Sequence, residues 1–246
     1  MASVHGVELP FSGPAAGAYD AGRAPYVPDV LAALDLPAPP ARVLDLAAGT
    51  GLLSRPLLAA GYEVVAVEPD PEMAAQQPEG IERLAAAAEA TGLPAASVDA
   101  VTVGDAWHWF DAMAAADEVH RVLRPRGRLA LVWRLSVAEE RPPALLAFYA
   151  RLLGALDPDH PGFRDERGRE ALAAHSGFAP LVHRTVRFAH RTDAEGLLAE
   201  AASASFVNAH DEREALMADL RGTLEGVGAV EVPYLADVWL TRRRRG

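Results

Sequence analysis

The chain has 246 residues, of which 50% are hydrophobic and 23% charged, with a formal net charge of −11 and no cysteine. This length fits one α/β domain, the composition excludes a disordered chain, and no apolar run is long enough to span a membrane. The acidic charge argues against a nucleic-acid partner, and the lack of cysteine excludes disulfides, thiolate catalysis and cysteine-bound metals. The N-terminus lacks the basic start and apolar run of a secretory signal, so we expect a cytoplasmic protein.

Strand and helix patterns alternate in the first half of the chain. Helices are predicted from residue 27 to the proline cluster at 37–40, and over 52–60, 71–76 and 111–123; strands are predicted over 42–46, 63–67, 81–86, 98–103 and 128–133. Such alternation predicts a parallel sheet with helices on both faces.

The pattern changes after residue 135. Helices are predicted over 142–156, 166–176, 193–203 and 211–224, with strands only over 181–190 and 232–241. Two late strands separated by helices predict a hairpin-like sheet edge with an inserted helical cap. We therefore expect a single domain, 1–246, whose core comprises 27–135, 178–192 and 230–242 and whose cap comprises 136–177 and 193–227.

The segment VLDLAAGTG, 43–51, joins a buried strand to a helix through a glycine-containing turn. Backbone in such a turn can lie against a ligand, and the start of the helix offers unpaired N–H groups. A dinucleotide-binding turn is the rival interpretation, but its usual third glycine is missing. Asp45 would repel a pyrophosphate, whereas a ligand with an ammonium group and no phosphates suits it. Glu68 ends the next strand 17 positions after Gly51, near the spacing at which an acidic residue accepts hydrogen bonds from ribose hydroxyls.

Four segments in order carry a resemblance to a known family: VLDLAAGTG, VVAVEPD, SVDAVTVGDAWHWFD and VLRPRGRLALVW. Together they resemble the motifs of class I S-adenosylmethionine-dependent methyltransferases, most closely the small-molecule branch with the ubiquinone-biosynthesis and trans-aconitate-type enzymes. The resemblance covers about 11–133, with weaker similarity at the last strand. It implies a Rossmann-like, doubly wound α/β fold with a seven-stranded, mostly parallel sheet and an antiparallel edge strand, S-adenosylmethionine as cofactor and S-adenosylhomocysteine as product.

The resemblance also implies roles for individual residues. Asp45 and the backbone at Ala47 and Gly49 would hold the methionine amino group, and Glu68 would take both ribose hydroxyls. The remaining cofactor contacts would come from Gly51 in the turn, Pro69 and Met73 on the adenine face, the backbone of Ala88 and Glu89 at the adenine edge, and Gly104. In the lead-in segment 19–26, Tyr19 would close over the cofactor, and Arg23 is either a partner for the methionine carboxylate or a solvent-facing arginine.

The aromatic segment 104–111 follows the fourth predicted strand, at the sheet edge where open α/β folds bind ligands. We assign Trp107 to the ligand side, where a π face suits a sulfonium, and Trp109 and Phe110 to the core. His108 is a candidate proton acceptor, with a structural histidine as the alternative. No set of histidines and carboxylates has metal-ligand spacing, so no metal is expected.

These residues predict transfer of a methyl group to oxygen, nitrogen or carbon of an unidentified small molecule by in-line displacement. Two alternatives stay open: a cofactor-binding relative that does not transfer methyl, by sulfonium-assisted rearrangement or without catalysis, and an NAD-dependent oxidoreductase. The acceptor is expected to bind in the cap. Five residues there either line the acceptor site or pack in the core between helices: Phe148, Tyr149, Phe163, Phe206 and His210. No membrane partner is expected, and nothing indicates an oligomeric state.

Overall fold

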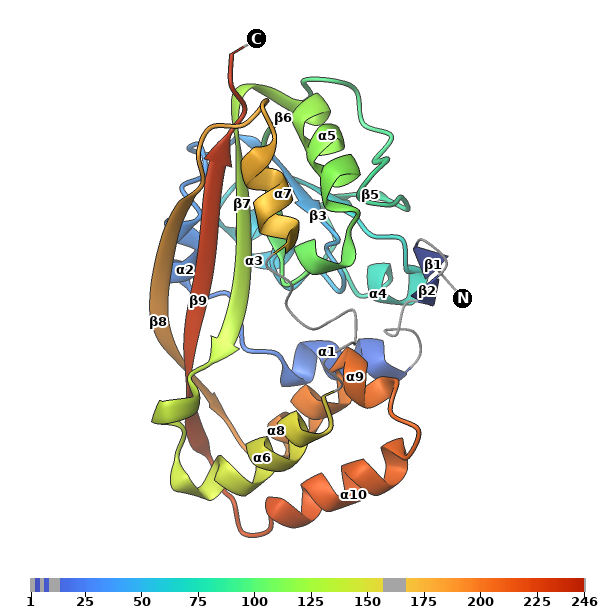
Figure 1. Ribbon diagram of the computed structural model, residues 1–246, viewed down its shortest axis with the longest axis vertical. Helices are drawn as coiled ribbons and strands as arrows, with labels where there is room; N and C mark the ends of the chain where they lie inside the picture. The colour runs from blue at the N-terminus through green and yellow to red at the C-terminus, as the bar shows by residue number, and fades with distance from the viewer. Residues whose placement is uncertain (1–2, 5–6, 9–13, 157–166, 246) are drawn as a thin grey trace.

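The structure is a computed structural model that describes residues 3–4, 7–8, 14–156 and 167–245, without the side chains of residues before 17 and of residue 167. Its main sheet has seven strands in the order β5-β4-β3-β6-β7-β9-β8 (Figure 1). Their bounds are β3 Arg42–Leu46, β4 Glu63–Val67, β5 Glu82–Leu84, β6 Val98–Gly104, β7 Leu123–Ser136, β8 Val182–Thr192 and β9 Val230–Arg242. A separate hairpin joins β1 Ser3–Val4 to β2 Val7–Glu8.

The direction of the strands matches the expected mostly parallel sheet. Strands β5, β4, β3, β6 and β7 pair in parallel, whereas β9 runs antiparallel to both β7 and β8. The predicted Rossmann-like fold with antiparallel pairing at one edge is therefore confirmed. Because five strands run the same way, the carboxyl ends of β3, β4 and β6 lie at one edge of the sheet, where ligands bind in folds of this kind.

Helices cover both faces of the sheet. In Figure 1, α5 (Ala112–Val122) and α7 (Arg167–Ala174) lie on one face, and α2 (Pro28–Ala33) and α3 (Ser54–Ala59) on the other. Helix α5 begins where the carboxylate of Asp111 accepts hydrogen bonds from two backbone N–H groups, and it buries Ala115, Val119 and Val122 at helical spacing against the sheet. Short elements complete this region: α4 Pro71–Ala74 and the 3₁₀ turns η1 Trp107–Trp109, η2 Ala138–Glu140 and η3 Pro143–Leu145.

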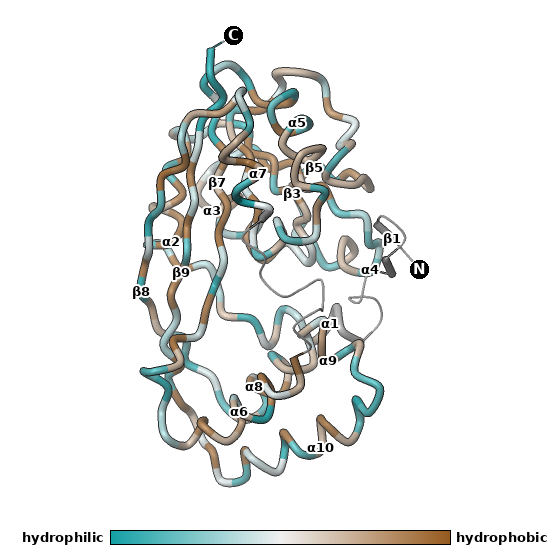
Figure 2. The backbone as a smooth tube through the Cα atoms, in the orientation of Figure 1, coloured by the Kyte–Doolittle hydropathy of each residue, from teal (hydrophilic) through white to brown (hydrophobic). Residues whose placement is uncertain are grey.

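A second group of helices lies beyond the carboxyl edge of the sheet (Figure 1). It consists of α1 Pro14–Gly22, α6 Leu146–Gly154, α8 Ala194–Ala202, α9 Ser205–Asn208 and α10 Arg213–Thr223, and we call α6, α8, α9 and α10 the cap. The cap has its own apolar core, which includes Phe148, Leu197, Val207 and Leu220. Figure 2 shows α10 alternating between apolar and polar residues, as expected for a helix with one buried face.

Some boundaries differ from the sequence prediction. Strand β7 extends to Ser136 because β9 continues to pair with it out to Tyr234. Helix α7 falls inside the range expected for the cap, but it packs against α5 on the sheet. The helices α1 and α9 were not predicted, and residues 157–166, including Phe163, lie outside the described residues. Within the described part of the chain, no helix is both long and apolar enough to cross a membrane.

Candidate active site

The turn after β3 has an unusual backbone. Ala47, Gly49 and Gly51 have φ angles of 54°, 55° and 83°, all in the left-handed region that glycine adopts most readily. This conformation folds the chain back sharply between β3 and the first turn of α3. The backbone at Ala47 and Gly49 consequently faces a cavity at the carboxyl edge of the sheet.

Asp45 lies at the base of this cavity and is 1% exposed. Its carboxylate accepts hydrogen bonds from the Ser54 hydroxyl (2.6 Å) and the Thr102 hydroxyl (3.1 Å). Burial raises the pKa of Asp45 to about 6, although these hydrogen bonds oppose the shift. A buried carboxylate without a cationic partner favours a ligand that brings positive charge.

Glu68, directly after β4, lies next to the same turn. One carboxylate oxygen accepts the backbone N–H of Gly49 (2.8 Å) and the other accepts that of Asp70 (2.9 Å). Burial raises the pKa of Glu68 to about 7 against the effect of these two bonds. The carboxylate is thus fixed in position beside the turn, and each of its oxygens has a second lone pair for a ligand hydroxyl.

Arg134, which also lines the cavity, belongs to a buried ion pair. The Asp105 carboxylate accepts hydrogen bonds from the Arg134 side chain at 2.5 and 2.8 Å and from its backbone N–H at 2.9 Å. Although burial opposes it, the Arg134 guanidinium lowers the pKa of Asp105, and Asp105 in turn raises the pKa of Arg134. The guanidinium also lies 4.0 Å from the centre of the Tyr26 ring, which packs so closely on Gly104 that a side chain there would overlap the Tyr26 hydroxyl.

A larger pocket adjoins this cavity, and Tyr19 and Arg134 line both. It lies between the ends of β6 and β7 and the helices α1, α6, α8 and α9. Besides Tyr19 and Arg134 it is lined by Arg23, Asp105, His108, Trp109, Trp133, Leu135, Ser136, Tyr149, Leu152, Leu153, Glu200, Ala204, Ser205 and Phe206. Aromatic and aliphatic side chains thus share this pocket with convergent polar and charged groups, a combination found in small-molecule sites.

Helix α1 connects the two halves of the site. On one side the Asp20 carboxylate accepts a hydrogen bond from the Thr50 hydroxyl and forms an ion pair with Arg55 (2.6 Å). On the other side Arg23 donates to the hydroxyl of Ser203 (2.9 Å) at the end of α8. The end of α1 packs tightly on α8, because a side chain at Gly22 would overlap the α8 backbone. One short helix therefore contacts both the turn after β3 and the cap.

Comparison with known proteins identifies the family. Residues 44–131 match the methyltransferase-domain family. The uncharacterized methyltransferase Rv3342 of Mycobacterium tuberculosis is 51% identical over 125 residues, covering 49% of this chain and 51% of that protein. An uncharacterized methyltransferase-like protein of Schizosaccharomyces pombe is 30% identical over 184 residues, covering 72% of this chain and 70% of that protein. The chain belongs to the class I methyltransferase family.

A solved structure supports the fold of this methyltransferase. A candidate type II methyltransferase from Anaeromyxobacter dehalogenans, 24% identical in sequence, superposes with a TM-score of 0.63 over 94% of this chain and 96% of that one. This likeness concerns the fold alone. The match to the mycobacterial methyltransferases spans about half of their length.

Of the other predicted cofactor residues, Met73 lies against the turn after β3. The Met73 side chain is 5% exposed and lies against Gly49, while Pro69 precedes the start of α4 and is partly exposed. Ala88 is buried, and the carboxylate of Glu89 accepts the backbone N–H of Asp111 (2.9 Å). Gly51 packs against Pro78 and does not line the described cavity, so its contribution is to the turn.

Trp107 does not lie on the ligand side as predicted, whereas Trp109 and Phe110 pack against the core as predicted. Trp107 is 1% exposed, packs in the core and donates its indole N–H to the carbonyl of Gly168 in α7 (3.0 Å). Trp109 is partly exposed and also lines the larger pocket. The segment forms a 3₁₀ turn, in which residues two apart point in different directions, and α7 covers Trp107.

His108 lies in the larger pocket, as a candidate proton acceptor should. Its Nδ1 accepts the indole N–H of Trp133 (3.3 Å). Because an indole N–H only donates, the neutral imidazole carries its proton on Nε2. In this state the nitrogen of His108 that could accept a proton is engaged by Trp133.

Sequence analysis did not identify Asp105 or Arg134. A signal was present, because Asp105 directly follows β6 and Arg134 directly follows the predicted strand over 128–133, which pairs with β6 as part of β7. Opposite charges at adjacent strand ends are expected to pair. Arg23 was identified, but the structure places it in the larger pocket next to Ser203.

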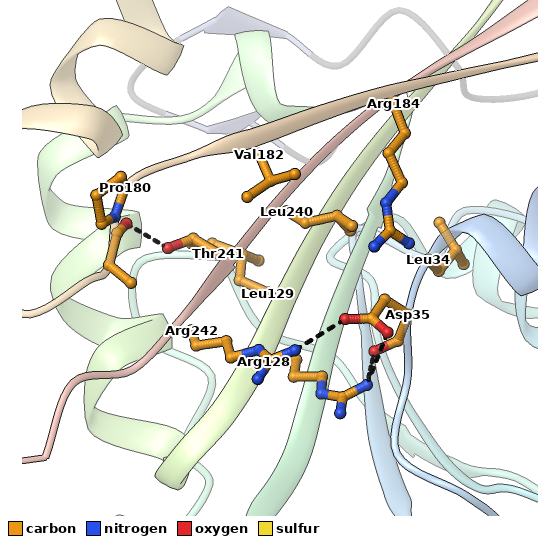
Figure 3. A pocket seen from close by; sticks show the side chains of 11 residues that line it. Leu34, Asp35, Arg128, Leu129, Pro180, Val182, Arg184, Leu240, Thr241 and Arg242 are labelled. Carbon is orange, nitrogen blue, oxygen red and sulfur yellow. Dashed lines mark hydrogen bonds and ion pairs between the residues drawn. The ribbon is translucent and has the colours of Figure 1, made fainter.

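A third depression lies at the opposite, amino end of β7 (Figure 3). There Arg128 and Arg242, which are paired across β7 and β9, both reach Asp35, at 3.3 and 3.1 Å. The shared carboxylate offsets the repulsion between two facing arginines. None of the predicted site residues lines this depression, so it is separate from the candidate active site.

Proposed function

We propose that this protein binds S-adenosylmethionine at the carboxyl edge of β3 and β4 and transfers its methyl group to a small molecule held under the cap. The observation that carries this proposal is the junction of two spaces: the cavity lined by Asp45, Ala47 and Gly49 adjoins the larger pocket at Tyr19 and Arg134. A cofactor in the first space would therefore be adjacent to an acceptor in the second.

The residues present fit this cofactor. The buried Asp45 carboxylate suits the methionine ammonium group, and Glu68, fixed by two backbone N–H groups, suits the two ribose hydroxyls. The backbone at Ala47 and Gly49 would contact the methionine moiety. Pro69, Met73, Ala88 and Glu89 would surround the adenine, and Tyr19 in α1 would close over the cofactor. Two buried carboxylates beside the turn disfavour the pyrophosphate of NAD.

S-adenosylmethionine, when bound, supplies a methyl group on a sulfonium that is already a good leaving group. The protein then contributes mainly alignment for in-line displacement, worth about 7–11 kcal/mol when the geometry is good. The aromatic wall, including Trp109 and Trp133, keeps water from the acceptor. His108 would lie beside the acceptor, with its Nδ1 engaged by Trp133.

Calorimetric titration with S-adenosylmethionine, S-adenosylhomocysteine and NADH tests the cofactor. We expect both sulfur ligands to bind and NADH not to bind, and Asp45→Ala and Glu68→Ala to weaken binding about tenfold or more, or about 1.4 kcal/mol. Glu63→Ala, at the exposed start of the same strand β4, is the matched control and should bind normally. Preference for NADH, or no binding of either sulfur ligand, contradicts the proposal.

Transfer needs a separate test, because a relative that binds the cofactor without transferring methyl would give the same titration. Incubation with methyl-labelled cofactor and a panel of amines, phenols and carboxylic acids should move the label to an acceptor in stoichiometric amount with S-adenosylhomocysteine. Conversion of an acceptor without label transfer would instead indicate a rearrangement.

A further inference from the structure

The larger pocket contains a carboxyl group that the proposed cofactor site does not use. Glu200 lies on α8 of the cap, deep in the protein, and remains partly accessible from the pocket. The Tyr149 hydroxyl donates to one of its oxygens (3.2 Å) and the Tyr234 hydroxyl to the other (3.0 Å). These hydroxyls come from α6 and β9, so three separate elements fix the carboxyl group at the pocket wall.

No cation is paired directly with Glu200 among the described residues: no arginine or histidine nitrogen lies within 4.0 Å of its carboxylate. Burial raises the pKa of Glu200, and the more distant charges of Arg23 and Arg141 oppose that shift without cancelling it. A buried carboxylate is costly when its charge is not compensated.

The other charged groups of the pocket are engaged elsewhere. Arg134 is neutralised by Asp105 at 2.5 Å. Arg23 is held by the hydroxyl and carbonyl of Ser203. Among the described residues, Glu200 is therefore the carboxylate of this pocket that no cation pairs directly, and Arg23, which is held by neutral groups, is its more distant counter-charge.

The walls around Glu200 suit a cation as well. Five aromatic side chains line the pocket: Tyr19, Trp109, Trp133, Tyr149 and Phe206. Aromatic faces attract cations, as Arg23 over the Tyr19 ring (5.0 Å) and Arg141 over the Tyr149 ring (4.1 Å) illustrate within this chain.

We propose that Glu200 recognises the acceptor by accepting hydrogen bonds from a cationic amine attached to an apolar or aromatic body. This inference rests on the proposed function, because it treats the larger pocket as the acceptor site. An ammonium group supplies both N–H donors and the missing positive charge. An alcohol of the same shape supplies a donor without the charge, and a carboxylate is repelled by Glu200.

Three probes of similar shape test this charge preference: phenethylamine, 2-phenylethanol and 3-phenylpropionate, titrated with and without saturating S-adenosylhomocysteine. We expect phenethylamine to bind about tenfold more tightly than either of the others, the ratio that one charge-assisted hydrogen bond supplies. Equal affinities, tighter binding of 3-phenylpropionate, or no binding of phenethylamine at millimolar concentration would overturn the inference.

The variant Glu200→Gln keeps the size of the side chain and removes its charge, so phenethylamine should lose its advantage. Glu195→Gln, on the exposed side of the same helix, should keep it. If Glu200→Gln does not fold, Glu200→Asp provides the test and should bind phenethylamine more weakly while still preferring it to 2-phenylethanol. If S-adenosylhomocysteine binds but the amine preference is absent, the acceptor inference alone fails; if S-adenosylhomocysteine does not bind, the proposed function fails.

Discussion

The turn after β3 and the larger pocket share Tyr19 and Arg134, but they are built in different ways. The turn comes from nine consecutive residues, 43–51, together with Glu68 from the neighbouring strand. The pocket combines residues from α1, β7, α6, α8 and α9, which extend from Tyr19 to Phe206 in the sequence. The first is mostly local structure, and the second depends on how distant segments pack.

Because the two regions are built differently, we expect them to respond to different changes. A local turn with buried carboxylates can bind one cofactor in the same way in many proteins. A pocket made from cap helices can change its lining without disturbing that turn. Disrupting distant contacts should therefore affect the pocket first, whereas changes in the turn should affect the cofactor.

The largest expected effect comes from breaking the ion pair between the two regions. Asp105→Asn removes the charge that neutralises Arg134, whose side chain is 4% exposed, and leaves a buried guanidinium without its partner. We expect a loss of about 3–5 kcal/mol in the free energy of unfolding, measured by urea denaturation. Asp219→Asn breaks the exposed pair with Arg151 and should cost about 0–1 kcal/mol. Equal losses in both variants would show that burial does not increase the contribution of the Asp105–Arg134 pair to stability.

The second effect concerns pH and the turn. Burial raises the pKa of Glu68 to about 7 and that of Asp45 to about 6. If ionised Glu68 accepts the ribose hydroxyls, affinity for S-adenosylhomocysteine should be constant above pH 7 and fall up to about tenfold per pH unit below it. Calorimetry between pH 8 and pH 6 measures this slope. Glu68→Gln should bind weakly and lose the pH dependence near pH 7, while Asp45 still titrates near pH 6. An unchanged slope near pH 7 in that variant would assign the titration to another group.

The third effect concerns the packing of α1 on the cap. Gly22→Ala places a methyl group in the backbone of α8, so we expect a loss of about 1–3 kcal/mol in unfolding free energy and weaker amine binding. Gly17→Ala is the matched control, because the same helix leaves open space around Gly17. That variant should gain about 0.5–1 kcal/mol from helix propensity. A gain in both variants would mean that α1 does not pack on α8 as described.

The smallest effect concerns the strained alanine of the turn. Ala47→Gly removes the backbone strain of a left-handed alanine, which stabilises the folded state by about 1–2 kcal/mol. Glycine also gives the unfolded chain more conformational freedom, which lowers the free energy of unfolding by about 0.4–1 kcal/mol. We expect a net gain of about 1 kcal/mol in thermal unfolding experiments. Ala48 is not left-handed, so Ala48→Gly should only lose stability, by about 0.4–1 kcal/mol. If both variants changed stability in the same direction, backbone strain at Ala47 would not explain the effect.

The aromatic segment illustrates where sequence analysis stops. Its position at the carboxyl edge follows from the strand before it, and the structure places it there. Which tryptophan lines the larger pocket depends on α7, whose Gly168 carbonyl accepts the Trp107 indole N–H. Helix α7 lies sixty positions further along the chain, so no local pattern predicts this contact.

The sequence by itself determined the alternating fold, the family and the turn with Asp45 and Glu68, because hydrophobic periodicity and a glycine turn act over a few residues. Tertiary structure alone decided that Arg134 pairs with Asp105, that Arg23 reaches Ser203, and that Glu200 faces the pocket between two tyrosines. Ion pairs and buried hydrogen bonds form between whichever groups packing brings together. Their partners are therefore fixed by the assembled fold and not by spacing along the chain.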